Sequence, residues 1–140
     1  MDVGDLEKVA QRYASSVRRG DRFFLVGELG TGKSTFARAY IRALGVTGTI
    51  PSPSFIMDAV YETGGMDIHH VDLFRLDCSG PELELLGLEE VLHAADVVLV
   101  EWADRLGDLR SRGGILIALG MAEDPGLREV RIDDRRVAGD

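Results

Sequence analysis

One segment of eight residues limits what this chain can fold into and bind. Residues 27–34 have the sequence GELGTGKS, which completes the pattern G-x-x-x-x-G-K-[ST]. The glycines of this pattern let backbone N–H groups turn inward and surround an anion. The lysine, Lys33, reaches the β- and γ-phosphates of a nucleotide, and the hydroxyl of Ser34 coordinates Mg²⁺. The segment therefore predicts a site for a nucleoside triphosphate with its magnesium ion.

The flanking residues provide the context that this loop needs. Residues 22–26 are apolar and aromatic, which predicts a buried strand. Residues 34–44 carry apolar side chains at helical spacing, and Gly45 follows as a stop. The dipole and free N–H groups of that helix would complete the anion site. Lys33 is also one of only two lysines beside fourteen arginines, and a compact ammonium suits a place among phosphates.

The rest of the chain alternates predicted helices and strands. The turn formers at 62–65 predict a hairpin, and those at 45–54 predict a surface loop. Helices are expected at residues 5–17, at 81–92 with a break near Gly87, and at 103–109; strands are expected at 55–61, 66–71, 97–100, 115–119 and 127–132. This order predicts an α/β protein with a three-layer, P-loop NTPase-like fold, in which helices flank a central mixed sheet.

Length and composition indicate a single domain. We expect one P-loop domain over residues 1–134 of the 140 and a flexible tail at 135–140. The N-terminus is acidic and no apolar run approaches a membrane span, so a cytoplasmic protein without membrane contact is expected. Cys78 is the only cysteine, which excludes an internal disulfide and fits a reducing compartment. The net charge of −8 argues against independent binding of nucleic acid, which draws on clustered positive charge.

Two carboxylates follow predicted strands and are the candidates for metal and water chemistry. Glu101 follows the strand at 97–100, and Asp72 follows the strand at 66–71. Ligand sites of open α/β sheets lie at the carboxyl ends of the strands, beside such a loop. Magnesium prefers phosphate oxygens, a hydroxyl, waters and one or two carboxylates, so Ser34 and Glu101 are the predicted metal ligands. A solvated acid without a role is the alternative for both residues.

Two aromatic features of the sequence are ambiguous. His69 and His70 are neighbours in a predicted strand, so their side chains point to opposite faces and cannot converge on one ion. We expect one of them to be in the core or hydrogen-bonded and the other to be exposed, and we predict no zinc site. Trp102, the only tryptophan, either packs at the strand end or contacts the nucleotide or the metal-bound acid.

Missing residue types narrow the class of nucleotide protein. The chain has no Asn, so the Asn-Lys-x-Asp motif that reads guanine cannot exist. Its only Gln, Gln11, belongs to the first predicted helix, away from the loop, so it cannot position water as in Ras-like enzymes. Residues 46–74 contain no arginine for a lid over the phosphates, which makes a small-molecule kinase the weaker interpretation.

Several segments together resemble the TsaE family, bacterial ATPases that take part in making threonylcarbamoyladenosine in tRNA. The similarity extends from about residue 5 to residue 132 and is far more specific than the phosphate loop alone. The matching segments are GELGTGKSTF at 27–36, SPSF at 52–55, HVDLFRL at 70–76, ELE and LGLEE within 82–90, and VLVEW at 98–102.

The resemblance implies a small ATPase that works with partners. Proteins of this family join TsaB and TsaD, which transfer a threonylcarbamoyl group to adenosine 37 of ANN-decoding tRNAs. ATP binding and weak, Mg²⁺-dependent hydrolysis would reset that complex between turnovers, and the tRNA would be held mainly by the partners. Alone, the protein is expected to be a monomer. A nucleotide-gated binding module that needs no hydrolysis and a small-molecule kinase remain the alternatives.

The resemblance also assigns roles to single residues. Lys33 would bind the phosphates, with Glu101 and Asp72 as the catalytic acids, and residues 52–55 would form a switch. Phe74 stands where the family usually has Tyr and so loses a hydroxyl; Ser54 replaces a Thr and Ala103 a Pro. None of these departures removes a phosphate or metal ligand. The full set expected to contact the nucleotide is Glu28, Leu29, Gly30, Thr31, Gly32, Lys33, Ser34, Thr35 and Trp102.

Overall fold

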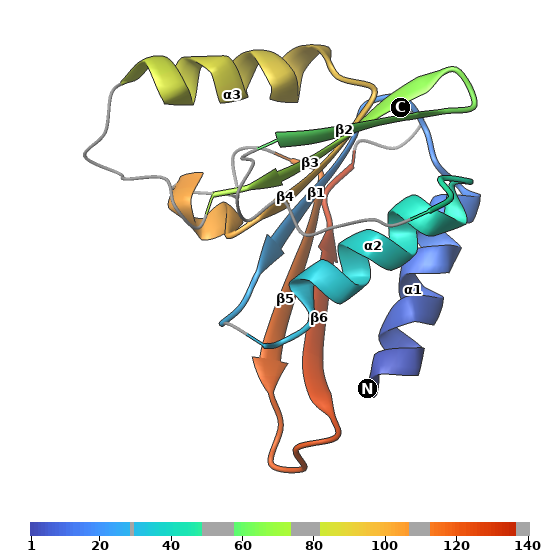
Figure 1. Cartoon of the computed structure of the whole chain (residues 1–140). Coiled ribbons are helices and arrows are strands. Elements are labelled where there is room, and N and C mark those ends of the chain that lie inside the picture. The colour runs from blue at the N-terminus through green and yellow to red at the C-terminus, as the bar shows by residue number, and fades with distance from the viewer. Residues whose placement is uncertain (29, 49–57, 74–81, 107–112, 137–140) are drawn as a thin grey trace.

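The structure is a computed structural model that describes residues 1–28, 30–48, 58–73, 82–106 and 113–136 (Figure 1). The helices are α1 (Val3–Ser15), α2 (Lys33–Ala43), α3 (Glu82–Ala94) and the 3₁₀ helix η2 (Ala103–Leu106). The strands are β1 (Asp21–Val26), β2 (Asp58–Thr63), β3 (Met66–Asp72), β4 (Val97–Glu101), β5 (Ile115–Met121) and β6 (Arg128–Asp134).

The strands form one mixed sheet in the order β2-β3-β4-β1-β5-β6. Neighbours among β3, β4, β1 and β5 are parallel, while β2 and β6 each add an antiparallel edge strand. The predicted hairpin is therefore β2–β3, and β1, which leads into the phosphate loop, lies in the middle of the sheet. The predicted fold class is confirmed.

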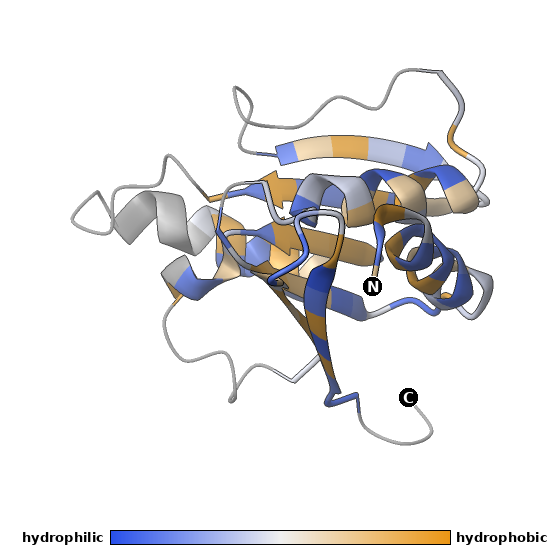
Figure 2. Cartoon of the chain, turned by 90° about the horizontal axis from the view of Figure 1, so that it is seen from below, coloured by the Kyte–Doolittle hydropathy of each residue, from blue (hydrophilic) through white to orange (hydrophobic). Residues whose placement is uncertain are grey.

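Two hydrophobic cores separate the three layers. Alternate residues of a strand face opposite sides, so Phe23 and Leu25 of β1 join the core under α1 and α2, whereas Phe24 joins the core under α3. Helix α3 lies on one side of the sheet and the α1–α2 pair on the other (Figure 1). The central strands are largely apolar, whereas the edge strand β6 is largely polar (Figure 2). Strand β4 is buried along its whole length.

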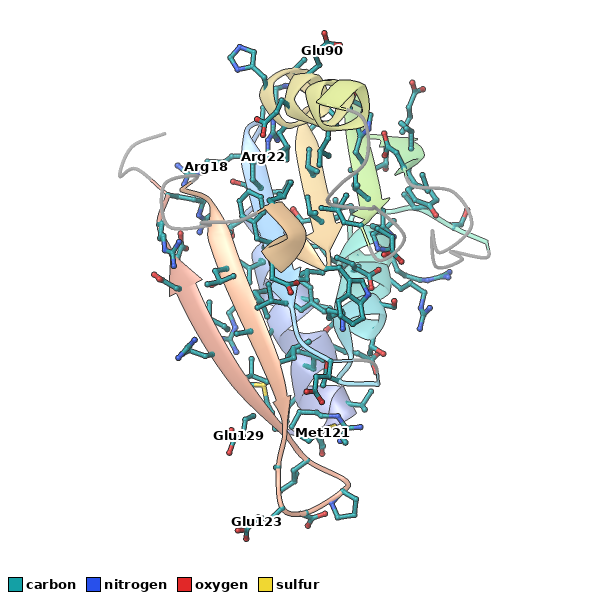
Figure 3. The ribbon with its side chains drawn as sticks, turned by 90° about the vertical axis from the view of Figure 1, so that its left-hand side faces the viewer. Arg18, Arg22, Glu90, Met121, Glu123 and Glu129 are labelled. Atoms are coloured by element: carbon teal, nitrogen blue, oxygen red, sulfur yellow. The ribbon has the colours of Figure 1, made fainter. Side chains whose placement is uncertain are left out.

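Arg22 ties the start of β1 to the end of α3. Its Nε donates to the carbonyl oxygen of Leu92 at 2.7 Å, and its Nη atoms reach the carbonyl oxygens of Ala95 and Asp96. The last carbonyls of a helix lack intrahelical partners, and a guanidinium both satisfies them and complements the helix dipole. Figure 3 shows Arg22 at the α3 end of the sheet and Met121, Glu123 and Glu129 at the opposite end.

Some predicted boundaries differ from the structure. Helix α3 continues through Gly87, where a break was predicted, because the helical hydrogen bonds do not require a side chain at this exposed position. The predicted tail begins at Arg135, yet the Arg135 N–H donates to the Gly114 carbonyl oxygen at 2.7 Å. Arg136 forms ion pairs with Asp134 and Asp21. Residues 137–140 of that tail lie outside the described residues.

Among the helices described here, none has the length and apolar character needed to cross a membrane.

Gly27 is the glycine of the loop that the fold constrains most. Its φ is +149°, and a Cβ there would lie 2.5 Å from the Leu119 carbonyl oxygen and 2.7 Å from Thr31 Oγ1. We expect Gly27→Ala to lower the free energy of unfolding by about 2–4 kcal/mol, from backbone strain and overpacking together. Denaturant unfolding measures this loss.

The matched control for Gly27→Ala is Gly30→Ala in the same loop. Gly30 also has a positive φ, +80°, but a Cβ there would meet nothing within 4 Å. Only the strain term remains, and we expect a loss of about 1 kcal/mol. Equal losses for the two variants would show that the contact with β5 is unimportant.

Candidate functional site

The phosphate loop is held in shape by its own hydrogen bonds. Thr31 is buried, and its Oγ1 donates to the Glu28 carbonyl oxygen at 2.7 Å. Gly32 has a φ of +109° and stands immediately before the first turn of α2, so the loop leads directly into a helix N-terminus. The Phe36 N–H donates to the Gly32 carbonyl oxygen at 3.0 Å and begins the helical bonding. An exposed loop ending at a helix N-terminus is a site for an anion.

Lys33 is the central cation of the site and is largely buried. Its Nζ donates to the carbonyl oxygens of Gly27 and Glu28, at 2.5 and 2.8 Å, and lies 4.2 Å from the centre of the Trp102 ring. Burial lowers the pKa of Lys33, and the charges of Glu101, Asp104 and Asp72 oppose that effect. The site thus places one ammonium among carboxylates, beside the loop where phosphates would bind.

The two predicted acids are neighbours in the sheet. Strands β3 and β4 are parallel, and their register pairs Asp72 with Glu101. Residues paired in this way point to the same face, which here is the face that carries α1 and α2. The Leu73 N–H donates to the Glu101 carbonyl oxygen at 3.1 Å, so the hydrogen bonding between the two segments continues to the last residue of β4. Both carboxylates are buried. Their negative charges act on the Lys33 ammonium, so the structure brings Asp72, Glu101 and Lys33 together.

Glu101 makes two side-chain contacts with the described residues. Its Oε1 accepts a hydrogen bond from Ser34 Oγ at 2.7 Å, and its Oε2 lies 2.5 Å from His70 Nε2. Burial would raise the pKa of Glu101, but the contacts with His70 and Ser34 and the charge of Lys33 outweigh it and hold the pKa below its usual value. Glu101 is therefore a carboxylate at neutral pH.

The oxygen donors of the site fit a magnesium ion bound with a nucleotide. Ser34 Oγ, Glu101 and Asp72 offer a hydroxyl and two carboxylates, the hard ligands that Mg²⁺ prefers. Within the part of the chain that the structure describes, no three His, Cys, Asp or Glu side chains converge as a complete metal site. An ion here would consequently need phosphate oxygens and water as further ligands, as is usual for Mg²⁺.

Trp102 has an unusual backbone conformation. Its φ of +57° is the only positive value at a non-glycine residue in the described chain. For a bulky side chain this conformation is costly, and such costs are found mainly at functional sites. The residue turns the chain from β4 into η2, with its ring against Lys33. Trp102 is also packed against the α3-side core, which is the packing role considered for it, while contact with a nucleotide stays a prediction.

The other residues predicted to contact the nucleotide differ in their position and exposure. Glu28 and Gly30 are exposed at the tip of the loop, and the Gly30 carbonyl oxygen accepts a hydrogen bond from Arg128 Nη2 at 3.2 Å. Thr35 lines a hollow between α1 and α2 together with Gln11. Leu29, the proposed switch at 52–55, Phe74 and Cys78 all lie outside the described residues.

Three residues near the site were not identified from the sequence as site residues: His70, Asp104 and Arg128. They come from β3, η2 and β6, and no local pattern links them to the loop. Of His69 and His70, one was expected to be in the core or hydrogen-bonded, and His70 is that residue. Its neighbour His69 is not exposed, contrary to expectation, because Nδ1 lies 2.7 Å from Asp58 Oδ2 and Nε2 lies 3.3 Å from Asp67 Oδ2.

The sheet, its glycine loop and the acids at the strand ends define an α/β protein with a P-loop NTPase-like fold. A family model described as "Threonylcarbamoyl adenosine biosynthesis protein TsaE" matches residues 1–129. The chain belongs to the TsaE family.

Individual relatives agree with this assignment. A protein of Bacillus subtilis named "tRNA threonylcarbamoyladenosine biosynthesis protein TsaE" is 32% identical over 120 residues, which cover 86% of this chain and 74% of that protein. A Streptomyces coelicolor protein of the same name is 37% identical over 101 residues, covering 71% and 68%. The crystal structure of Bacillus subtilis YdiB superposes with a TM-score of 0.77 at 26% identity, covering 97% of this chain and 82% of that one.

Proposed function

We propose that this protein binds ATP with Mg²⁺, hydrolyses it slowly, and thereby supports the threonylcarbamoylation of adenosine 37 in ANN-decoding tRNAs. The observation that carries the proposal is the meeting of four groups at one edge of the sheet. Lys33 lies at the loop, Ser34 is hydrogen-bonded to Glu101, and Asp72 is the register neighbour of Glu101. Membership of the TsaE family supplies the pathway.

Each residue has a role that its surroundings support. Lys33 and the N–H groups at the start of α2 bind and orient the phosphates, and Trp102 lies against Lys33 at the edge of the site. Ser34 and Glu101 would hold the magnesium ion, which supplies charge neutralisation at the β- and γ-phosphates when it is bound. Glu101, kept ionised, and Asp72 orient the attacking water. The chemistry needs no covalent intermediate on the protein.

The partners in this proposal are TsaB- and TsaD-like proteins, which carry out the transfer itself. The chain has a net charge of −8, and its carboxylates surround the site, so tRNA is expected to be held by the partners. Hydrolysis would return the complex to its starting state after each transfer. A cytoplasmic location and a monomeric state in the absence of partners belong to the same proposal.

Fluorescence of Trp102 tests nucleotide binding directly, because it is the only tryptophan and lies against Lys33. We expect ATP to change its emission saturably, Mg²⁺ to tighten the response, and GTP to bind more weakly. Phosphate release should be slow for the protein alone and faster with TsaB- and TsaD-like proteins and tRNA. Failure of every nucleotide to bind, even with these partners, would overturn the proposal.

An assay that counts tRNA modifications in the presence of the partner proteins separates a requirement for hydrolysis from simple nucleotide gating. If ATP and a non-hydrolysable analogue support equal numbers of tRNA modifications per complex, occupancy alone regulates docking. We expect the analogue to support only a single round, because the reset requires hydrolysis. Transfer of phosphate to a small metabolite without any partner would instead indicate a kinase.

A further inference from the structure

A buried histidine lies beside the acid of the site. His70 is on β3, two residues before Asp72 and therefore on the same face of the sheet, and its side chain has no solvent exposure. Its Nε2 lies 2.5 Å from Glu101 Oε2, while its Nδ1 has no hydrogen-bond partner among the described residues. The single polar contact seen for this buried ring is thus with Glu101.

The contact between His70 and Glu101 joins side chains from three elements into one hydrogen-bonded network. Ser34, in the first turn of α2, donates to Oε1 of Glu101 on β4, and His70 on β3 contacts Oε2. An ionised carboxylate can only accept hydrogen bonds, so the His70 nitrogen that faces it must carry the proton. Both oxygens of Glu101 are therefore engaged, and Oε1 is the one directed at the phosphate loop.

We propose that His70 is a positioning residue for Glu101: its Nε2–H holds Oε2 so that Oε1 is presented to Ser34 and to the magnesium ion of a bound nucleotide. The inference rests on the proposed function, since it concerns the acid expected to hold that ion. His70 does not touch the nucleotide itself. Its loss would weaken metal binding because Glu101 would no longer be held in position. Groups that orient a metal ligand typically change metal affinity or activity by about 10–100-fold when they are removed.

Two substitutions separate positioning from simple packing. His70→Leu keeps an apolar side chain in the buried space but removes the donor, whereas His70→Gln retains an N–H donor at a similar reach. We expect both variants to bind ATP without metal within about threefold of the wild type, measured by Trp102 fluorescence, because phosphate binding depends on Lys33. We expect Mn²⁺ affinity in the presence of ATP, measured by electron paramagnetic resonance, to fall about 10–100-fold in His70→Leu and to recover largely in His70→Gln.

A double-mutant cycle with Glu101→Gln identifies the residue through which His70 acts. If His70 works only through Glu101, adding His70→Leu to Glu101→Gln should leave Mn²⁺ affinity unchanged, because the interaction is already lost. Losses that add in the double variant would overturn the proposal. So would wild-type Mn²⁺ affinity in His70→Leu, or an equal loss in His70→Gln.

A measurement on the unaltered histidine keeps the test valid even if His70→Leu does not fold. In the wild-type protein, imidazole ¹⁵N spectra should show a proton on His70 Nε2 that exchanges slowly with water, and Glu101→Ala should abolish that protection. A bare Nε2 in the wild type would overturn the proposal. Because this readout needs no nucleotide, it is distinct from failure of the proposed function, which would appear as absent ATP binding by the wild type.

Discussion

Replacing Lys33 with alanine is expected to weaken ATP binding by a factor of about 100 or more, since each hydrogen bond from a charged group contributes about 1.5–3 kcal/mol and Lys33 can make several to phosphate. A second effect acts in the same direction. Lys33 is the cation that faces the charges of Glu101, Asp104 and Asp72, so its removal leaves a site of carboxylates that repels the polyphosphate. Trp102 fluorescence or calorimetry measures the affinity.

Lys8→Ala is the matched control for this prediction. Lys8 is the only other lysine and is exposed on α1, so its substitution removes the same charge at a distance from the loop. We expect Lys8→Ala to bind ATP as the wild type does. If Lys33→Ala bound and hydrolysed ATP normally, the phosphate loop would not be the nucleotide site.

Replacing Glu101 is expected to abolish most turnover while sparing nucleotide binding. Glu101→Gln retains the size of the side chain and an acceptor for Ser34 but removes the charge that would hold Mg²⁺. Loss of one preorganised electrostatic contact at a reacting centre typically lowers the rate by about 10²–10³-fold. We expect a loss of that size in phosphate release, with metal-free ATP affinity within about threefold of the wild type because Lys33 remains. Glu101→Ala should lose turnover at least as completely.

Stability must be measured beside activity for these variants. Glu101 is buried between Ser34 and His70, and an unsatisfied buried group costs about 1–3 kcal/mol. Thermal unfolding shows how far a variant has lost structure rather than chemistry. Glu123→Ala, an exposed acid at the far end of the β5–β6 hairpin, is the control for removing one negative charge (Figure 3). Equal turnover in Glu101→Gln and Glu123→Ala would remove Glu101 from the mechanism.

The fold was largely predictable because its signals are local. The phosphate loop, the apolar stretch of β1 and the helical spacing of α2 each lie within a few consecutive residues, and they specify strand, loop and helix in order. Asp72 and Glu101 could be chosen because strand-end acids in such sheets meet at one edge. The break expected near Gly87 in α3 does not occur, since one weak helix former at an exposed position does not end a helix.

His70 shows why the rest of the site could not be predicted. It is separated from Glu101 by thirty-one positions, and the two meet only because β3 and β4 are neighbours in the sheet. The strand order β2-β3-β4-β1-β5-β6 does not follow the order of the chain, so sequence alone does not reveal which strands are adjacent. For the same reason the sequence did not indicate that Arg128 lies near the site. Its guanidinium contacts the carbonyl oxygen of Gly30 from the edge strand.

By itself the sequence determined the class of protein, the loop that would hold phosphate and the acids available to it. These depend on residue types at short spacing, which act through local backbone geometry and charge. Only the tertiary structure decided that Glu101 is held between Ser34 and His70, and that Trp102 turns its ring against Lys33. Contacts between distant residues arise when the sheet assembles and buries them together, and that assembly sets the ionisation and direction of Glu101 at the loop of residues 27–34.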